Sequence, residues 1–269
     1  MDLGLTGRAC AVTGASRGIG RETARQLCAE GASVLLVARS GDALADAAEE
    51  CGRAGAAAHG NAAPLVLDMT GPDAGERIVA EAGDRFGKLD VLVNNAGTAQ
   101  RRDLEEVPDS DWQAAWELNV MAPLRAMRAA VPGMAERGWG RIVNVSSSAG
   151  KRPSTETAEY SVAKAAELSL SRVFADRYAD RGVLVNAICP GPTSSGLWMD
   201  AGGLADQARE RSGRPRDEVL DSLAASRPIG RFAEVPEIAG AIVFLCSERA
   251  SYVAGAAWSV DGGSVQVII

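Results

Sequence analysis

The chain has 269 residues, 46% hydrophobic and 4% aromatic, which suits one domain with a core of small aliphatic side chains. A formal net charge of -7 without a basic run excludes nucleic acid and anionic membrane as expected partners and favours a small molecule. We expect a cytoplasmic protein without membrane contact, because the sequence has neither a signal-peptide pattern nor a run of about eighteen apolar residues. Five scattered cysteines and one histidine lack metal-site spacing, so we expect no metal.

Short β-branched runs alternate with alanine-rich segments of helical period, the pattern of a parallel sheet covered by helices on both faces. We predict strands at 8–13, 33–38, 63–67, 89–93, 141–146, 183–188 and 256–260. We predict helices at 18–30, 42–51, 72–86, 109–137, 158–181 and 235–247. The early strands are apolar at both alternating positions, as strands buried on both faces must be. The sequence therefore predicts a single doubly wound α/β domain over 1–269 with a seven-stranded parallel sheet.

A stretch at about 192–228, between the sixth strand and the last helix, interrupts this alternation. It contains Gly202-Gly203 and a highly charged segment at 209–218. Structureless stretches of this length inside compact domains are usually lids or disordered. We therefore expect an irregular substrate lid here.

A glycine-rich turn, 13–20, joins the first predicted strand to the first helix. Its glycines let the backbone turn tightly and approach a ligand that any Cβ would block. The free N–H groups and the positive end of the helix can hold a pyrophosphate. The alternative is a plain turn. We predict dinucleotide contacts from Gly14, Ser16, Arg17, Gly18, Ile19 and Gly20.

The residues after the second and third strands bear on the choice of cofactor. Arg39 stands where NAD-preferring sheets of this kind usually carry an acid for the ribose hydroxyls. With Arg17 it can form charge-assisted bonds to a 2'-phosphate and stack on adenine, which favours NADP(H) over NAD(H). Alternatively, both arginines are solvated loop residues. Asp68, followed by Met69, either accepts a hydrogen bond from the adenine amino group or caps a turn.

Tyr160 and Lys164 are four residues apart in a predicted helix, which places a phenol and an ammonium on one face. A phenol ordinarily ionises near about pH 10 and is a poor proton shuttle at neutral pH, but a fixed cation beside it favours the phenolate. Ser147, in a run of three serines that ends the fifth predicted strand, lies thirteen residues before Tyr160. Long helices also contain tyrosine and lysine at this spacing by chance, so motifs elsewhere in the chain must show whether the pair is catalytic.

With Asn94-Asn95-Ala96-Gly97 after the fourth strand, the combination resembles the short-chain dehydrogenase/reductase family from Thr13 to Gly263. The resemblance implies a Rossmann fold that binds NAD(P). The loop at 16–20 and the tail from Gly230-Arg231-Phe232 look most like the 3-oxoacyl-acyl-carrier-protein reductase group, though members of other specificity share both. The implied catalytic set is Asn119, Ser147, Tyr160 and Lys164, and the implied cofactor contacts are Asn95, Ala96, Gly97, Tyr160, Lys164, Pro190, Gly191, Thr193 and Ser195.

The resemblance also implies a mechanism. NADPH would deliver hydride to a carbonyl carbon while Tyr160 protonates the oxygen, which Ser147 holds. Lys164 would favour the phenolate and bind the nicotinamide ribose, and Asn119 would hold a water that links Lys164 to solvent. The alternatives are that Asn119 only bridges helices and that strand register presents Ser146 or Ser148 instead of Ser147. We expect an enzyme that interconverts a ketone, or a 3-oxoacyl group, with a secondary alcohol.

Other functions and partners stay open on the sequence. One alternative is an NAD(P)-dependent dehydrogenase of a cyclic, polyol or aromatic secondary alcohol, and another is a non-catalytic dinucleotide-binding scaffold. An acyl carrier protein is a candidate partner because Arg137 and Arg181 fall where related reductases dock it, although surface arginines are common near helix ends. Family members are commonly tetramers through the two long helices and the last strand, so we expect a homotetramer.

Overall fold

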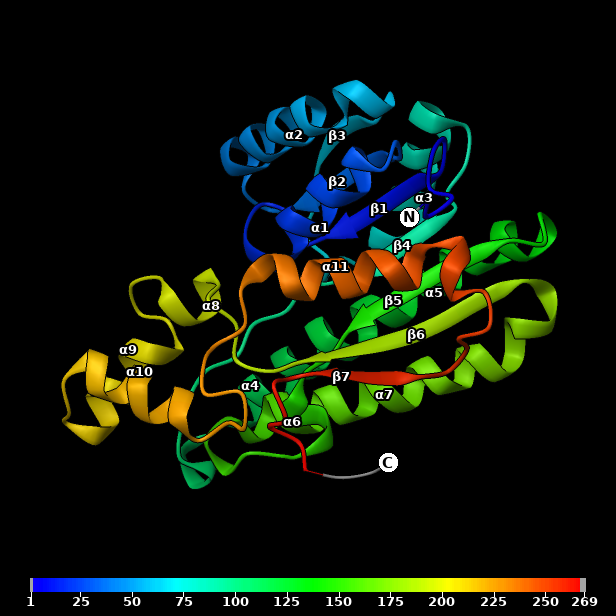
Figure 1. Cartoon of the computed structure of the whole chain (residues 1–269). Coiled ribbons are helices and arrows are strands. Elements are labelled where there is room, and N and C mark those ends of the chain that lie inside the picture. Colours follow the sequence, from blue (N-terminus) through cyan, green and yellow to red (C-terminus); the bar gives the residue numbers. More distant parts are fainter. Residues whose placement is uncertain (1, 267–269) are drawn as a thin grey trace.

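A seven-stranded parallel sheet forms the centre of the computed structural model, which describes residues 2–266 (Figure 1). The strand order is β3-β2-β1-β4-β5-β6-β7, and every neighbouring pair is parallel. The predicted doubly wound Rossmann-type sheet is therefore confirmed. The strands are β1 (Ala9–Thr13), β2 (Ser33–Ala38), β3 (Asn61–Val66), β4 (Val91–Asn94), β5 (Gly140–Val145), β6 (Val183–Pro190) and β7 (Ala257–Val260).

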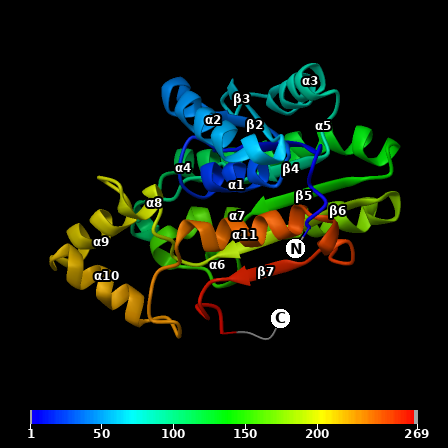
Figure 2. The same cartoon turned by 45° about the horizontal axis from the view of Figure 1, so that its top comes forward.

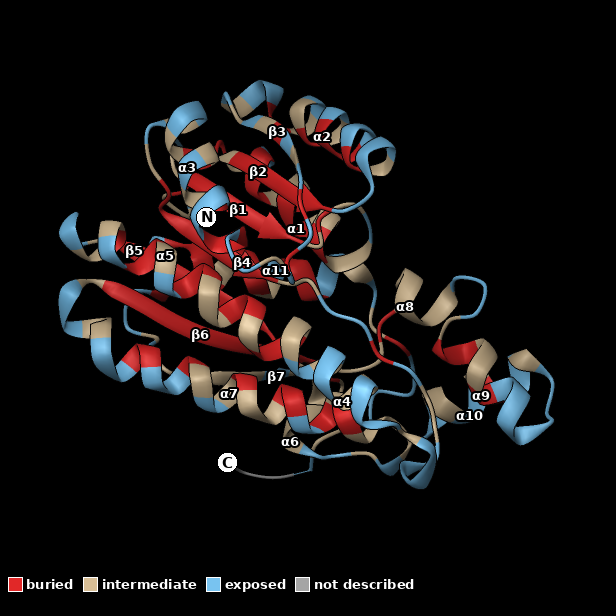
Figure 3. Ribbon diagram, turned by 180° about the vertical axis from the view of Figure 1, so that it is seen from behind, coloured by how far each residue is buried: buried red, intermediate tan, exposed pale blue. Residues whose placement is uncertain are grey.

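The inner strands are buried along their length, as Figure 3 shows. Every residue of β1, β4, β5 and β6 is buried, and β2 is buried beyond its first residue. The outermost strand β3 is partly exposed and contains Pro64, a residue that sheets tolerate at their edges. The continuous apolar runs of the inner strands are thus explained by helices on both faces.

Two layers of helices enclose the sheet (Figure 2). One layer packs α1 (Gly18–Ala29), α2 (Gly41–Gly55) and α11 (Val235–Cys246) around a core that includes Leu27 and Ile238. The other layer packs around a second core that includes Ile78 and Met134. Its helices are α3 (Ala74–Phe86), α4 (Asp109–Trp116), α5 (Ala122–Glu136) and α7 (Ala158–Tyr178). All five cysteines are buried and unpaired.

The prediction of one uniform helix over 109–137 was wrong. A π-helical turn at Glu117–Met121 separates α4 from α5, and the N–H of Ala122 donates to the carbonyl of Glu117 five residues earlier. Pro123 offers a physical reason, because it has no N–H to bond the carbonyl of Asn119 four residues before it. Such turns are frequent at functional sites, and this one contains Asn119.

The expectation of an irregular stretch at 192–228 was also wrong. It contains three helices, α8 (Gly196–Met199), α9 (Leu204–Ser212) and α10 (Arg216–Ala225), which project to one side of the domain (Figure 1). Leu204 and Ala208 are buried one helical turn apart, while the charged residues at 209–211 are exposed. Gly213, at φ +65°, ends α9 in the left-handed conformation that favours glycine.

Short elements complete the chain. A four-residue helix, α6 (Ser148–Lys151), follows β5, and single 3-10 turns occur at 56–58, 104–106, 155–157, 179–181 and 248–250. Within residues 2–266, no helix combines the length and the apolar character needed to cross a bilayer.

Candidate active site

The strand order reverses between β1 and β4, and open α/β sheets bind their ligands in the crevice at this point. Thr13, at the end of β1, ties the two strands together. Its Oγ1 accepts hydrogen bonds from the N–H groups of Asn95 and Ala96, at 2.9 and 3.0 Å. The Nδ2 of Asn95 in turn donates to the carbonyl of Thr13 at 2.9 Å. The loop after β4 is thereby fixed against the glycine-rich turn.

The glycine-rich turn has the shape that its sequence predicts. Gly14 and Gly18 have φ of +64° and +56°, and a Cβ on Gly20 would lie 2.4 Å from Nδ2 of Asn95. Glycine is therefore required for both conformation and space. At the start of α1, the N-cap residue Arg17 provides no side-chain cap, so the first-turn N–H groups remain available for an anion.

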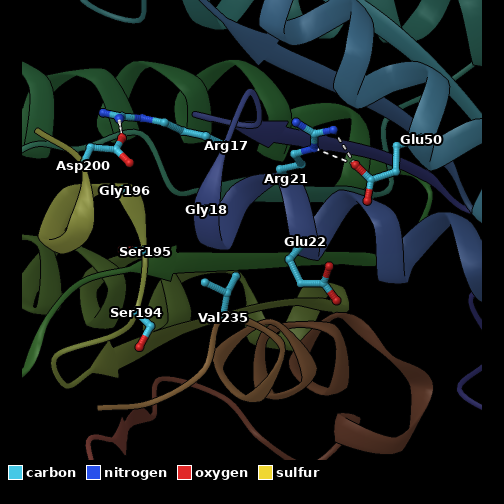
Figure 4. Close-up of a pocket in the computed structure, with 10 residues that line it drawn as sticks. All are labelled: Arg17, Gly18, Arg21, Glu22, Glu50, Ser194, Ser195, Gly196, Asp200 and Val235. Carbon is cyan, nitrogen blue, oxygen red and sulfur yellow. Dashed lines mark hydrogen bonds and ion pairs between the residues drawn. The ribbon is translucent and has the colours of Figure 1, made fainter.

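A pocket of about 360 Å³ opens beside this turn (Figure 4). The segment after β6 forms its opposite wall, and the Cβ of Ser195 is 3.5 Å from where Gly18 would carry a Cβ. Arg17 extends across the rim to form an ion pair with Asp200, next to α8. The structure thus brings together two predicted cofactor segments that are distant in sequence. The lining residues are Arg17, Gly18, Arg21, Glu22, Glu50, Ser194, Ser195, Gly196, Asp200 and Val235.

The segment after β6 is held close to the end of β7. A Cβ on Gly191 would lie 2.8 Å from the Cα of Asp261, so only glycine fits this approach. Thr193 is 2% exposed, and its Oγ1 donates to the carbonyl of Gly191 at 3.0 Å. Pro190, the last residue of β6, and these neighbours form a rigid connection into the pocket wall.

The residues predicted to bind the adenosine half lie after β2 and β3. Arg39 is exposed, and its positive charge helps to lower the pKa of Asp68. The Oδ1 of Asp68 accepts hydrogen bonds from the N–H and Oγ1 of Thr70, at 3.0 and 2.9 Å, and these bonds lower its pKa. The turn-capping alternative for Asp68 is therefore present in the structure. Met69 is 5% exposed, with its side chain in the core.

Tyr160 and Lys164 lie one turn apart on α7, as their spacing predicts. The Nζ of Lys164 lies 5.8 Å from the centroid of the Tyr160 ring. It donates to the carbonyl of Val145, at the end of β5, at 2.8 Å. The ammonium is 3% exposed and therefore fixed in position, whereas the tyrosine is only partly buried.

Asn119 approaches this lysine from the π-helical turn. Its Nδ2 donates to the carbonyl of Ala115 at 2.9 Å, and its buried Oδ1 has no hydrogen-bond partner within residues 2–266. A Cβ on Gly97 would lie 3.1 Å from this Oδ1 and 3.7 Å from Nζ of Lys164. Asn119, Gly97 and Lys164 therefore meet at one point, where a side chain at position 97 would intrude.

The three serines after β5 have different environments. Ser146 is buried, and its Oγ donates to the carbonyl of Lys164 at 2.9 Å. Ser147 is partly exposed and caps α6, its Oγ accepting from the N–H of Ala149 at 3.1 Å. Ser148 opens α6. Of the first two, only Ser147 keeps its hydroxyl hydrogen available, which favours it over Ser146.

The sequence analysis missed Glu167, which is 1% exposed and accepts a hydrogen bond from Nζ of Lys164 at 2.9 Å. Burial raises the pKa of Glu167 to about 7, although the Lys164 ammonium acts in the opposite direction. Burial alone would lower the pKa of Lys164, but Glu167 and Tyr160 outweigh it and the pKa is raised. The sequence signal that could have indicated this pair is an acid three residues after a lysine in a predicted helix.

Replacing Glu167 by Gln tests this buried pair. A raised carboxyl pKa means that the native state keeps a proton that the unfolded chain releases between pH 4.5 and about 7. The carboxyl group therefore costs the native state up to about 3 kcal/mol as pH rises through this window. We expect the free energy of unfolding of the wild type, measured in urea, to fall relative to that of Glu167→Gln between about pH 5 and about pH 8.

The matched control for this experiment is Glu76→Gln, which changes an exposed helical carboxylate on α3. Its stability should follow that of the wild type across the same pH range. Parallel curves for the wild type and Glu167→Gln would contradict the raised pKa.

Comparisons with known proteins identify the family to which this site belongs. The family described as enoyl-(acyl carrier protein) reductase matches residues 14–265. The 3-oxoacyl-[acyl-carrier-protein] reductase FabG of Salmonella typhimurium is 32% identical, covering 98% of this chain and 100% of that protein. The cis-4-hydroxycyclohexanecarboxylate dehydrogenase of Sinomonas cyclohexanicum is 38% identical, covering 97% of both.

A solved structure agrees with these sequence matches. The L-sorbose reductase from Gluconobacter frateurii, complexed with NADPH and L-sorbose, superposes with a TM-score of 0.91 at 36% identity, covering 100% of both chains. The resemblance to the 3-oxoacyl-acyl-carrier-protein reductases is thus confirmed, and relatives with other substrates are equally similar. The chain belongs to the short-chain dehydrogenase/reductase family of oxidoreductases.

Proposed function

We propose that this protein is an NADP(H)-dependent oxidoreductase that interconverts a ketone, or a 3-oxoacyl group, with a secondary alcohol. The observation that carries the proposal is the buried ammonium of Lys164, 5.8 Å from the ring centroid of Tyr160. A cation fixed beside a phenol stabilises the phenolate, which makes the phenol a better proton donor and its anion accessible as a base.

Tyr160 and two neighbouring side chains have separate roles in the reaction. Tyr160 gives its proton to the carbonyl oxygen during reduction and takes a proton from the alcohol during oxidation. Ser147 donates its hydroxyl hydrogen to the same oxygen and stabilises the developing negative charge. Asn119, whose Oδ1 lacks a protein partner beside Lys164, holds a water that resupplies the proton.

The residues present fit a bound dinucleotide. The uncapped first turn of α1 would hold the pyrophosphate, and Arg39 would pair with the 2'-phosphate. Lys164 would bind the nicotinamide ribose, while the segment from Pro190 to Ser195 would meet the carboxamide. When bound, the reduced nicotinamide supplies the hydride. The NADPH in the L-sorbose reductase structure supports this choice of cofactor.

The helices α8, α9 and α10 serve in this proposal as the substrate lid, over about 192–228. The Arg17–Asp200 ion pair joins the base of the lid to the cofactor turn. A lid that closes over the nicotinamide excludes water from the reacting atoms.

Replacing Tyr160 by Phe tests the reaction. We expect kcat for ketone reduction to fall by about 100-fold or more, because general acid catalysis contributes at least that much. The dissociation constant for NADPH, measured by nicotinamide fluorescence, should remain unchanged. The control is Tyr178→Phe at the other end of α7, where the ring packs against Phe174. Undiminished turnover in Tyr160→Phe would remove Tyr160 from the reaction.

Replacing Arg39 by Asp tests the cofactor preference. The substitution removes a charge-assisted bond to the 2'-phosphate and adds a repelling carboxylate, so we expect NADPH affinity to fall by about 100-fold. NADH affinity should change little, because NADH has no phosphate at this position. Arg77→Asp, on the exposed face of α3, is the matched control. Equal losses for both cofactors would show that Arg39 does not contact the phosphate.

The runner-up function is an NAD(P)-dependent dehydrogenase of a cyclic or polyol secondary alcohol. The names of the 38% identical hydroxycyclohexanecarboxylate dehydrogenase and of the L-sorbose reductase favour it. The acyl-carrier alternative has less support, because Arg137, expected at the docking surface, donates instead to the carbonyl of Leu89. Turnover of an acetoacetyl thioester would favour the acyl reductase, whereas activity confined to cyclic ketones or sugars would favour the runner-up.

We further propose a homotetramer built through α4, α5, α7 and β7. Trp116 on α4 and Val162 and Val173 on α7 are 45%, 48% and 63% exposed, and these two helices are packed side by side. Burying such side chains against a second copy removes apolar surface from water. Light scattering at micromolar concentration should give four times the chain mass, and Val173→Asp should weaken the assembly. A monomeric wild type would contradict the proposal.

A further inference from the structure

Four side chains form a continuous row between the active-site loop and the lid. Arg101 lies 5.6 Å from the ring centroid of Trp198, and Trp198 packs edge-to-face on Phe232 at 5.2 Å. Arg227 lies 5.8 Å from the ring centroid of Phe232. We call Arg101, Trp198, Phe232 and Arg227 the arginine–aromatic row.

The two guanidinium groups of the row are only partly compensated. Arg101 forms an ion pair with Glu156, and its side chain is 14% exposed. Arg227 has no carboxylate partner within residues 2–266, and burial and the charge of Arg101 both lower its pKa. The Nε atoms of both arginines are buried without a hydrogen-bond partner in the same range. Two guanidiniums against one carboxylate leave the partly buried charge of Arg227 without an anion, although its Nη1 donates to Oγ of Ser226 at 2.9 Å.

The row lies where the loop after β4 meets the lid and the segment that precedes Tyr160. Arg101 is four residues beyond Gly97, where a Cβ would meet Asn119 and Lys164. The N–H of Arg101 donates to Gln207 on α9 at 2.8 Å, which joins this loop to the lid. The next residue, Arg102, donates its N–H at 3.0 Å to the carbonyl of Glu156, four residues before Tyr160.

We propose that the substrate carries a carboxylate, which binds between Arg101 and Arg227 at the arginine–aromatic row. Guanidinium groups bind carboxylates through paired, charge-assisted hydrogen bonds, and the unpartnered Nε–H groups are suitable donors. Trp198 and Phe232 pack against the carbon skeleton between the carboxylate and the reacting carbonyl. The inference rests on the proposed function and narrows its substrates to oxo acids and the corresponding hydroxy acids.

The carboxylate takes no part in the bond changes of the reaction. A bound reduced nicotinamide would supply the hydride to the carbonyl carbon, and Tyr160 would give its proton to the oxygen as the C=O π bond breaks. A neutral sugar or an acyl thioester would leave the charge of Arg227 without an anion, so both are expected to be poorer substrates than an oxo acid of matching size.

The test compares 4-oxocyclohexanecarboxylate with its neutral methyl ester, following NADPH oxidation at the nicotinamide absorbance. We expect kcat/KM to be higher for the acid by about tenfold or more. In Arg227→Met this preference should vanish, because KM should rise more for the acid than for the ester. Arg227→Lys should recover part of the preference because it keeps the charge. Arg77→Met, which removes an exposed arginine on α3, should behave as the wild type.

Failure of carboxylate recognition and failure of the oxidoreductase function give different results. Thermal unfolding and NADPH affinity of Arg227→Met should match those of the wild type, so that a lost preference reports substrate binding. Equal use of acid and ester by the wild type, or a preference that survives in Arg227→Met, would overturn the carboxylate inference and leave the reductase standing. No turnover of acid, ester or any other ketone or alcohol with either cofactor would overturn the proposed function itself.

Discussion

The buried ammonium of Lys164 is the interaction on which the site depends. An ammonium that is 3% exposed is unfavourable unless hydrogen bonds and an opposite charge replace the lost water. The carbonyl of Val145, at 2.8 Å, and the carboxyl group of Glu167, at 2.9 Å, accept hydrogen bonds from it, and Glu167 adds the opposite charge when it ionises. The bond to Val145 ties α7 to the end of β5, and the two contacts together fix the position of the ammonium near the Tyr160 ring.

The fold and much of the site could be predicted because they depend on local pattern. Strands buried on both faces are apolar at successive positions, as at 34–38 in β2 and 91–93 in β4, and the chain alternates such strands with helices. Gly14, Gly18 and Gly20 occupy positions where a Cβ would clash or the backbone has positive φ, so the glycine spacing alone indicates the turn. The four-residue spacing of Tyr160 and Lys164 likewise fixes their common face on α7.

The remaining features depend on contacts between distant segments, which no local pattern specifies. Arg101 meets Trp198 only after the lid packs against the loop that follows β4. The lid helices were not predicted because α9 and α10 have few buried apolar residues. The many charged residues at 209–218 make their helical periodicity hard to recognise. In the sequence, Glu167 looks like an ordinary acid on the surface of a helix. Its carboxyl group is buried only because that face of α7 packs against the sheet.

The π-helical turn at Glu117–Met121 makes the length of this helix critical. A π turn contains one residue more than the α-helical turn that it replaces. Loss of one residue within 117–121 would let the π turn close into a regular α-helical turn, and α4 and α5 on either side would keep nearly the same orientation. The residues of the turn itself would change direction, so the side chain of Asn119 would move away from Gly97 and Lys164. The number of residues in this segment therefore matters for the position of Asn119.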